Sequence, residues 1–309
     1  MEAKPILQTI GLTKDYKGFK AVDNLFMTVY EGDVYGFVGE NGAGKTTLIR
    51  LVTGLTHPTQ GEYSLFGTMN TEASFASGKK NLAAIVEKVS VNRGLSAIEN
   101  IRMQCKITGA KKTEEEMKEL LRLVGLGDVA DAKKRAGRFS LGMRQRLGLA
   151  IALVSDPKFV ILDEPMNGLD PQGFIDMRET ILRLNKLGVT FLISSHILSE
   201  LDKVCNRVGF LSHGRLLEEL SIADLRDKAR GKIVIGAKNV ADLVGKLKDS
   251  FKLEDYKVEG DLLTIYDKLD VNDVLAFLVK NKIKIDTINS GEETIEDYYY
   301  KLMHVEVRT

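Results

Sequence analysis

The sequence has no apolar run that is long enough to cross a lipid bilayer. A membrane-spanning helix needs about 20 consecutive apolar residues, whereas the longest apolar stretch, residues 149–154, lies between Arg146 and Asp156. The first residues, MEAKPILQTIG, also lack the apolar centre of a secretory signal peptide. These two absences predict a cytosolic chain.

Cysteine is scarce, with two residues in a chain of 309. Cys105 and Cys205 lie far apart in the sequence, and neither belongs to a CxxC or Cys/His cluster. Metal sites and redox motifs need such clusters, and disulfides are rare in cytosolic proteins. We therefore expect two buried free thiols, with a disulfide or a metal site as the alternatives.

Neither sign of charge is in excess, because 44 lysines and arginines accompany 43 aspartates and glutamates. Proteins that bind nucleic acid usually carry a basic excess, which neutralises phosphate groups. The balance therefore argues against nucleic acid as a partner. The length and the apolar fraction of 44% are typical of one large globular domain with a smaller appendage.

A glycine-rich loop carries the first functional signal. Residues 34–38 predict a buried strand, residues 46–55 have helical periodicity, and the segment GENGAGKTT that joins them matches GxxxxGK[ST]. Glycines let backbone N–H groups close around phosphate oxygens, Lys45 can neutralise phosphate charge, and the Thr46 hydroxyl can coordinate Mg²⁺. The candidate nucleotide-binding residues are Gly39, Glu40, Asn41, Gly42, Ala43, Gly44, Lys45, Thr46 and Thr47.

Two adjacent carboxylates follow a second apolar strand. Residues 159–162, FVIL, predict a buried strand that ends in Asp163 and Glu164. If the carboxyl end of this strand surfaces beside the phosphate loop, Asp163 can hold Mg²⁺. Glu164 then points elsewhere and can polarise an attacking water. Two adjacent acids in isolation are usually a solvated turn, but the phosphate loop upstream favours the functional interpretation.

Two weaker signals lie near these motifs. A helix predicted to start at Ser140 would leave backbone N–H groups exposed and so form a second anion site, an ordinary capped helix being the alternative. The residues of this helix start are Ser140, Leu141, Gly142, Met143, Arg144 and Gln145. His196 follows a strand predicted at residues 190–194 and is expected near Asp163, although a lone histidine is more often structural.

The order of elements predicts an α/β fold. Residues 6–37 carry short strands, and residues 92–157 are mostly helical, with a capping box formed by Thr113 and Glu116. Residues 174–187 predict a further helix between the strands at 159–162 and 190–194. This arrangement indicates a parallel sheet with a helical insert.

The sequence changes character from about Ile222. The segments KIVIGA, DLLTIY and KIKIDTI alternate like strands, and DLVGKLKD and DVLAFLVKN have helical periodicity. We therefore expect a main domain over residues 1–221, with its helical insert at about 90–157. A small α+β domain without catalytic motifs is expected over residues 222–309.

The order of these motifs resembles the ATP-binding cassette (ABC) ATPase family over roughly residues 5–220. The phosphate loop matches that family's Walker A motif, and the helix start at Ser140 resembles its signature motif. Asp163 and Glu164 match Walker B and its catalytic glutamate. The resemblance implies an ATP-hydrolysing P-loop NTPase with Mg²⁺ as cofactor, built from an ABC-type ATPase core with an antiparallel β subdomain and a helical insert.

The same resemblance gives roles to three further residues. Asp170 lies in the segment NGLD, which resembles the D-loop. His196 corresponds to the switch histidine, which would act beside the catalytic Glu164. Tyr16 lies where the family stacks an aromatic ring on adenine.

The sequence also departs from the commonest family pattern. Leu141 and Met143 interrupt the usual signature, and Glu87 stands where many members carry a glutamine. A carboxylate can still approach Mg²⁺, so Glu87 joins Thr46 and Asp163 as a candidate metal ligand, but it cannot donate a hydrogen bond as an amide does. Together with SLGMRQRLGLAIAL and SSHILSELDKVCNRVGFLSHG, Glu87 looks similar to bacterial exporters of peptide antibiotics, such as bacitracin-resistance and lantibiotic-immunity ATPases.

The resemblance also implies two kinds of partner. A second copy of the chain would pair head to tail, so that each ATP lies between one Walker A motif and the other signature. An integral membrane permease would hold the chain at the cytoplasmic face of the cell membrane. We expect this permease to dock on residues 89–103, where Leu95, Ile98, Ile101 and Met103 could form a groove, with ordinary core packing of these residues as the alternative.

The expected function is therefore that of an energy subunit for export of a peptide antibiotic or a similar amphiphile. The alternative is an ABC-type ATPase that acts in translation or DNA repair. Relatives in translation typically carry two cassettes, and those in chromosome repair carry long coiled coils. The single cassette, the short insert and the charge balance favour transport.

Overall fold

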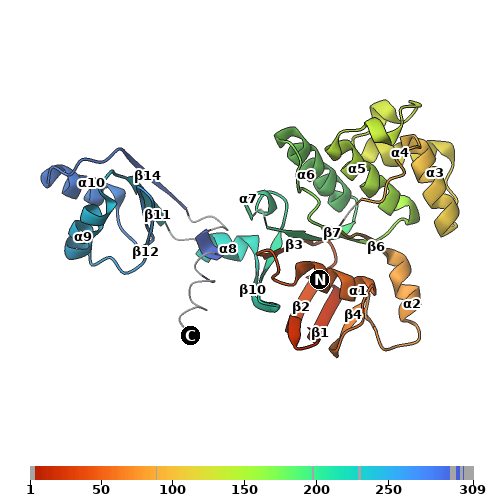
Figure 1. Ribbon diagram of the computed structural model, residues 1–309, viewed down its shortest axis with the longest axis horizontal. Helices are drawn as coiled ribbons and strands as arrows, with labels where there is room; N and C mark the ends of the chain where they lie inside the picture. The colour runs from red at the N-terminus through yellow and green to blue at the C-terminus, as the bar shows by residue number, and fades with distance from the viewer. Residues whose placement is uncertain are drawn as a thin grey trace. The chain divides into compact units, whose positions relative to one another are not determined.

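The chain divides into two compact units, Met1–Ile222 and Ala223–Thr309 (Figure 1). The computed structural model describes residues 4–87, 89–196, 198–228, 231–292, 297–299 and 302. Within these ranges, no helix is both long enough and apolar enough to cross a membrane. Cys105 and Cys205 are both buried and free, as the sequence predicted.

A six-stranded sheet forms the centre of the first unit. Its order is β10 (Arg215–Ser221), β9 (Arg207–Ser212), β3 (Val34–Gly39), β8 (Thr190–Ser195), β7 (Phe159–Asp163) and β6 (Leu82–Ile85). The strands from β9 to β6 are parallel, and β10 is antiparallel to β9. Every residue of β3, β7 and β8 is buried, which is typical of parallel strands that are covered on both faces. The predicted strands at 34–38, 159–162 and 190–194 are confirmed.

An antiparallel sheet packs against the phosphate-loop side of this centre. Its strands are β1 (Pro5–Tyr16), β2 (Phe19–Tyr30), β4 (Gln60–Leu65) and β5 (Thr68–Met69). Leu12 and Leu25 of this sheet share one core with Leu48 of helix α1 (Lys45–Thr53) and with Phe159 of β7. The predicted antiparallel β subdomain is therefore part of the fold.

Helices form the rest of the first unit. They are α2 (Phe75–Gly78), α3 (Ala97–Thr108), α4 (Glu114–Leu123), α5 (Leu141–Ala152), α6 (Pro171–Lys186) and α7 (Leu198–Leu201). The capping box of Thr113 and Glu116 is confirmed at the start of α4. A second capping box, Ser96 with Glu99 at the start of α3, was not predicted. Helix α6 begins before the predicted residue 174, because Asp170 caps it and a proline occupies its first turn.

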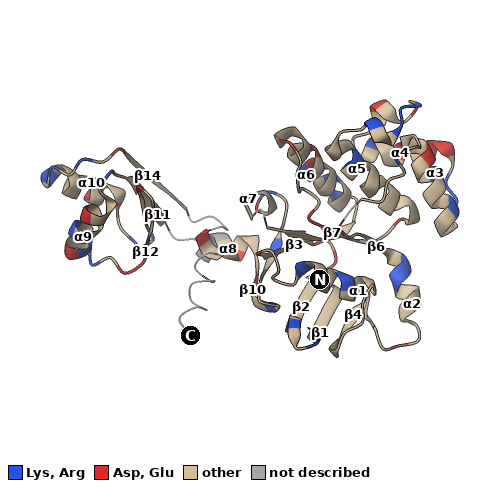
Figure 2. Cartoon of the chain, viewed as in Figure 1, with Lys and Arg blue, Asp and Glu red and all other residues tan. Residues whose placement is uncertain are grey.

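Acidic and basic side chains are mixed on the helical region, as Figure 2 shows for α3 and α4. Several form ion pairs on or beside α4. Arg122 lies 2.7 Å from Glu115, and Lys118 lies 2.6 Å from Asp131. The acidic partner of each pair is largely exposed, so each pair contributes little to stability.

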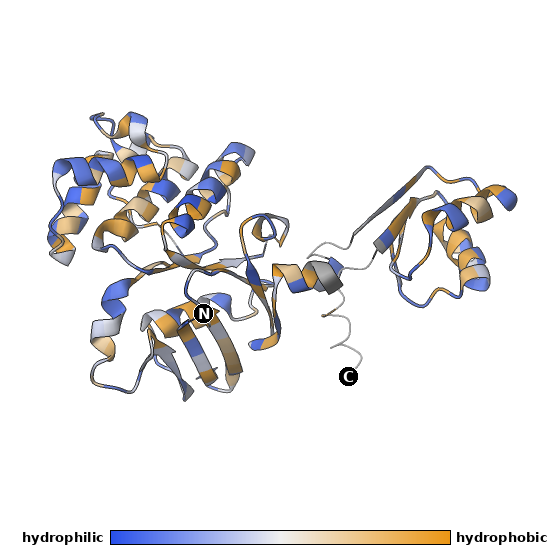
Figure 3. Cartoon of the chain, turned by 180° about the vertical axis from the view of Figure 1, so that it is seen from behind, coloured by the Kyte–Doolittle hydropathy of each residue, from blue (hydrophilic) through white to orange (hydrophobic). Residues whose placement is uncertain are grey.

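The second unit has the split β-α-β topology of ferredoxin-like domains. Helix α8 (Ile222–Lys228) precedes β11 (Gly231–Gly236), α9 (Val240–Phe251), β12 (Tyr256–Glu259), β13 (Leu262–Ile265), α10 (Val271–Lys280) and β14 (Thr287–Glu292). The sheet order is β12-β13-β11-β14, and all of its neighbouring strands are antiparallel. In Figure 3, apolar and polar residues alternate around α9 and α10. The apolar residues of both helices pack with Ile235 and Leu263 in a core that belongs to this unit.

Two details of this unit differ from the sequence-based prediction. The segment KIKIDTI was predicted as a strand, but β14 begins only at Thr287. Ile283 and Ile285 instead pack against the core from the preceding loop, and their alternation imitated a strand. The short strand β12 was missed, although Tyr256 and Val258 alternate with Lys257 and Glu259, because four residues that are exposed or only half-buried give a weak signal.

Candidate active site

A cavity of about 350 Å³ lies at the carboxyl ends of the parallel strands. The phosphate loop forms most of its wall, and the loop after β7 contributes the rest together with the start of β2. The lining residues are Phe19, Ala21, Asn41, Gly42, Gly44, Lys45, Thr46, Thr47, Glu164 and Asn167. The structure thus brings together most of the predicted phosphate loop and the second of the two predicted acids.

The glycines of this loop are required by its backbone. Gly44 precedes α1 with φ 109°, a region that side chains with a Cβ rarely adopt. A Cβ on Gly44 would also lie 2.2 Å from the carbonyl oxygen of Ala21. On Gly39, a Cβ would lie 2.6 Å from the carbonyl oxygen of Leu211. The loop can therefore pass this close to its neighbours only without side chains at these positions.

Lys45 crosses the inside of the loop and is 6% exposed. Its Nζ donates to the carbonyl oxygens of Gly39 at 2.6 Å and Glu40 at 3.1 Å. It also lies 3.5 Å from Oε1 of Glu164. A buried ammonium group needs such partners, and its place in the cavity wall suits it to a phosphate.

Asp163 and Thr46 meet beside the loop. The Thr46 hydroxyl donates to Oδ2 of Asp163 at 3.0 Å, and the Ser194 hydroxyl donates to Oδ1 at 2.6 Å. These hard oxygen atoms fit Mg²⁺, which usually takes one or two protein ligands and completes its shell with phosphate and water. No cluster of three or more acidic, histidine or cysteine side chains suited to a metal occurs among the described residues. The donor set thus fits a cation that shares its shell with a nucleotide.

Glu164 and His196 form a second polar pair. Nδ1 of His196 lies 2.8 Å from Oε2 of Glu164, and both side chains remain partly exposed. Glu164 has φ 49°, and its backbone N–H donates to the Ser194 carbonyl at 3.2 Å and to the Ser194 hydroxyl at 3.0 Å. This held backbone directs the Glu164 carboxylate into the cavity. A carboxylate in this position can accept a proton from water.

The signature segment lies outside this cavity. Ser140 caps α5 by accepting a hydrogen bond from the Met143 N–H at 3.1 Å. Asp170 caps α6 in the same way, accepting from the Gly173 N–H at 3.1 Å. Gly142 is buried, and a Cβ there would lie 3.6 Å from Gly173 Cα. The two helix starts therefore pack together, and none of the signature residues, all of which are described, lines the cavity of its own chain.

Tyr16 and Glu87 are also absent from the cavity wall, although both are described. Tyr16 is 45% exposed at the end of β1, with Nζ of Lys14 5.1 Å from its ring centroid. The Glu87 carboxylate forms an ion pair with Arg50 of α1. The role of Glu87 as a metal ligand remains a prediction.

Four residues of the site were not predicted from the sequence. Ser194 lies one residue before the end of β8 and holds Asp163, while Phe19, Ala21 and Asn167 line the cavity. Asn167 belongs to the segment that was assigned to the D-loop, so its closeness in sequence to Glu164 could have identified it as a site residue. The other three carry no local signal, because their places depend on pairing between distant strands.

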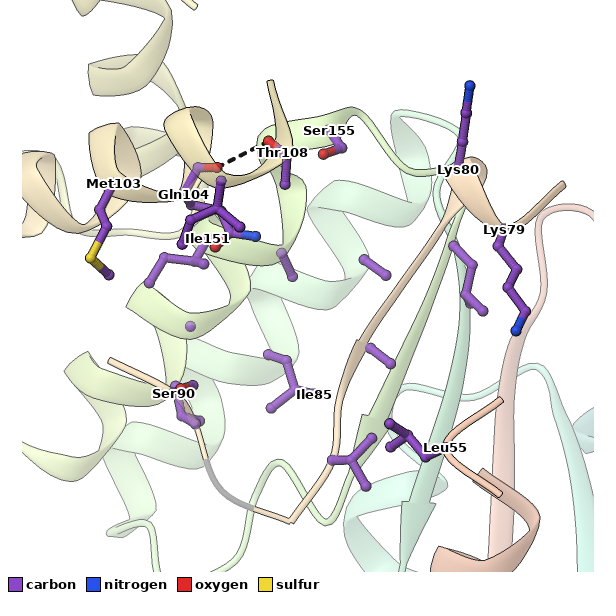
Figure 4. Close-up of a pocket in the computed structure, with 18 residues that line it drawn as sticks. Leu55, Lys79, Lys80, Ile85, Ser90, Met103, Gln104, Thr108, Ile151 and Ser155 are labelled. Carbon is purple, nitrogen blue, oxygen red and sulfur yellow. Dashed lines mark hydrogen bonds between the residues drawn. The ribbon is translucent and has the colours of Figure 1, made fainter. Parts of the chain in front are cut away.

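A second cavity, of about 630 Å³, lies between the helical region and the central sheet. Figure 4 shows Met103 and Gln104 of α3 and Ile151 of α5 on one side, with Ile85 of β6 and Leu55 on the other. Leu55 and Ile107 are 67% and 70% exposed at this groove.

Only part of the predicted docking groove lies in this second cavity. Met103 lines it, as does Val89. Leu95 and Ile98 are half-buried and lie outside this cavity, so their part in docking remains a prediction, whereas the groove position predicted for Ile101 was wrong. Ile101 is fully buried, since it lies on the face of α3 that packs into the helical region.

Comparison with known proteins decides the family. The sequence profile of the ABC transporter family matches residues 22–167. The bacitracin transport ATP-binding protein BcrA of Bacillus licheniformis is 40% identical over 305 residues, which cover 96% of this chain and 97% of BcrA. The chain belongs to the ABC transporter ATP-binding proteins.

Other relatives of this ABC transporter ATPase agree. The lantibiotic transport ATP-binding protein SrtF of Streptococcus pyogenes is 37% identical over 214 residues, covering 69% of this chain and 90% of SrtF. The ADP conformation of MJ1267, an ATP-binding cassette of an ABC transporter, is 25% identical with a TM-score of 0.63, covering 70% of this chain and 91% of MJ1267. The predicted P-loop fold and the ATPase class are confirmed. The chain binds ATP and hydrolyses it.

Ser194 is expected to act by positioning the Walker B carboxylate. In Ser194→Ala, Asp163 loses a 2.6 Å hydrogen bond and the Glu164 N–H loses one acceptor. A hydrogen bond to a charged group is worth about 1.5–3 kcal/mol, so ATP turnover should fall by roughly 10- to 100-fold. Steady-state phosphate release and equilibrium ATP binding should be measured together, and binding should change less than turnover.

The control is Thr180→Val, which removes a part-buried hydroxyl that bonds to the Asp176 carbonyl within α6. This variant should keep most of its turnover. Equal losses in the two variants would show that Ser194 has no specific role at the site.

Proposed function

We propose that this ABC transporter ATPase uses ATP with Mg²⁺ to power a separate membrane permease, which exports a peptide antibiotic or a similar amphiphile. The observation that carries the proposal is one polar group, in which Lys45, Thr46 and Glu164 line the cavity while Asp163 bonds to Thr46 and His196 lies beside Glu164. The names of the relatives add the cargo class, because BcrA is a bacitracin transport protein and SrtF a lantibiotic transport protein.

The residues of the site divide the proposed chemistry among them. The phosphate loop and Lys45 hold the phosphates, and Thr46 and Asp163 hold Mg²⁺, which would neutralise charge on the phosphate oxygens. Glu164 orients the attacking water and accepts its proton. His196, 2.8 Å from Glu164, holds that carboxylate in place and can contact the γ-phosphate. Phosphoryl transfer needs positioning and charge neutralisation more than covalent help, and these groups can supply both.

The proposed active unit is a head-to-tail dimer. Ser140 and the N-terminus of α5 form an anion site that is separate from the cavity of the same chain. A nucleotide held at Lys45 can therefore contact a signature segment only on a second copy. Two composite sites follow from two chains, each with the Walker A motif of one copy and Ser140 of the other.

The groove between α3, α5 and β6 is the proposed contact with the permease. It combines exposed apolar side chains, Leu55 and Ile107, with Lys79 and Lys80 at one end. It also joins the nucleotide site, because α1 begins at Lys45 in one cavity and Leu55 follows its end in the other. As a rigid helix between the two cavities, α1 can pass movement from ATP to the permease. Binding to the permease would place the chain at the cytoplasmic face of the membrane.

The general base is tested by Glu164→Gln. This change keeps the shape of the side chain and one acceptor oxygen but removes its basicity. A positioned general base is worth about 10²–10⁴-fold in rate, so single-turnover phosphate release should slow by at least ~100-fold. Equilibrium binding of ATP should stay near normal, and ATP-loaded dimers should accumulate.

Glu119→Gln on α4 is the matched control, because Glu119 is exposed, forms an ion pair with the surface residue Arg122 at 3.0 Å and lies outside the nucleotide cavity. Its phosphate release should be unchanged. Near-normal phosphate release by Glu164→Gln would mean that another group, such as His196, accepts the proton of the attacking water.

The composite site is tested by mixing two inactive variants. Lys45→Ala damages the Walker A half, and Ser140→Arg places a bulky cation in the signature half. A mixed dimer keeps one intact site, formed by Lys45 of one chain and Ser140 of the other. Phosphate release should therefore reappear on mixing. No recovery, together with a monomer in chemical cross-linking during turnover, would contradict the dimer.

The docking groove and the cargo class can be tested in one strain. Deletion of the gene should sensitise the cells to bacitracin or a lantibiotic, and the wild-type gene should restore tolerance. Ile107→Glu should fail to restore it and fail to co-purify the permease, because it places a charge in the apolar groove. The purified variant should still hydrolyse ATP.

Leu187→Glu serves as the control, because Leu187 is 64% exposed at the end of α6 and outside the groove. It should restore tolerance. Full tolerance with Ile107→Glu would exclude the groove as the docking site, and unchanged tolerance in the deletion strain would exclude this cargo class.

A further inference from the structure

Two aromatic side chains meet at the tip of the first hairpin. Strands β1 and β2 are joined by Lys17 and Gly18, both with positive φ, and the strand register pairs Tyr16 with Phe19. Residues that lie opposite each other in an antiparallel pair share one face of the sheet. The rings of Tyr16 and Phe19 therefore project from the same side of the hairpin.

The hairpin is attached to the phosphate loop two residues beyond Phe19. The carbonyl of Ala21 lies so close to Gly44 that a Cβ there would be 2.2 Å away. Gly214 joins the two segments, because its N–H donates to the Ala43 carbonyl at 2.9 Å and its carbonyl accepts from the Asp23 N–H at 2.8 Å. The start of β2 is thus held against the loop, and Phe19 and Ala21 both line the nucleotide cavity.

The two rings have different surroundings. Lys14 lies over the ring of Tyr16, with Nζ 5.1 Å from the centroid, and its Nζ is held there by the His57 carbonyl at 2.7 Å. Tyr16 is 45% exposed, whereas Phe19 is 65% exposed and belongs to the cavity wall. An exposed phenyl ring is ordinary on a protein surface. Beside a phosphate loop, however, the exposed ring of Phe19 offers an apolar face to the part of a nucleotide that extends beyond its phosphates.

We propose that Phe19 is a second aromatic contact for the nucleotide and packs against the purine base beside Tyr16. This inference rests on the proposed nucleotide site. The phosphates are held by charge and backbone N–H groups, which do not recognise a base. A base stacks on any aromatic face and gains dispersion energy and burial. Phe19 therefore contributes affinity for the nucleoside part of ATP and none for its phosphates.

The test compares two ligands on the same variants. Equilibrium binding of ATP and of inorganic tripolyphosphate, both with Mg²⁺, is measured for the full chain and for Phe19→Ala. Loss of an aromatic–base contact should weaken ATP binding by about 5- to 100-fold. Tripolyphosphate has no base, so its affinity should not change. Phe19→Tyr keeps an aromatic ring and should bind ATP as the wild type does.

Two further variants complete the test. Phe26→Ala removes a ring that is 56% exposed on the same strand but outside the cavity wall, and it should bind both ligands normally. Tyr16→Ala combined with Phe19→Ala should lose more ATP affinity than either change alone. Unchanged ATP binding by Phe19→Ala would overturn the inference, as would an equal loss for both ligands, which would indicate a distorted loop. Failure of the wild type to bind either ligand would instead refute the nucleotide site itself.

Discussion

The parallel register of three strands is the constraint on which the site depends. The ladder pairs Asp163 of β7 with Ser194 of β8, and Val38 of β3 with Ser195 of β8. Because parallel strands end at one edge, the phosphate loop, the acidic pair and His196 all follow strands at the same place. A slip of one residue in β7 would turn Asp163 to the opposite face of the sheet and separate it from Thr46. Residues more than 100 positions apart thus become one site through backbone hydrogen bonds.

The charges of the site also depend on one another. Lys45 is almost fully buried, and its Nζ lies 3.5 Å from the Glu164 carboxylate. Asp163 is 6% exposed and accepts hydrogen bonds from two hydroxyl groups. Buried charges without such partners would cost several kcal/mol each. A phosphate that draws Lys45 toward itself would weaken its contact with Glu164 and leave that carboxylate free to accept a proton from water. In the proposed mechanism, binding and catalysis would therefore use the same pair of side chains.

The first unit places two cavities at the two ends of one short helix. Helix α1 starts at Lys45 in the nucleotide cavity, and Leu55, just after its end, lines the groove. Arg50, between them, pairs with Glu87. Glu87, which stands where many family members carry a glutamine, therefore forms its ion pair with the helix that joins the two cavities. The second unit has its own core and contains none of these residues.

The sequence by itself determined the elements whose signals are local. Residues that are close together in the chain predict the apolar strands β3, β7 and β8. They also predict the glycine loop around Lys45 and the capping box at Thr113. Each motif that indicated the family is likewise local, and the sequence also gives the order of these motifs. Only the tertiary structure decided that Ser194 holds Asp163, that Phe19 lines the cavity and that Ile101 is buried while Ile107 is exposed at the groove. These facts depend on strand pairing and helix packing between distant segments. For the same reason, the apolar alternation around Ile283 resembles a strand, although packing against the core of its unit makes this segment a loop.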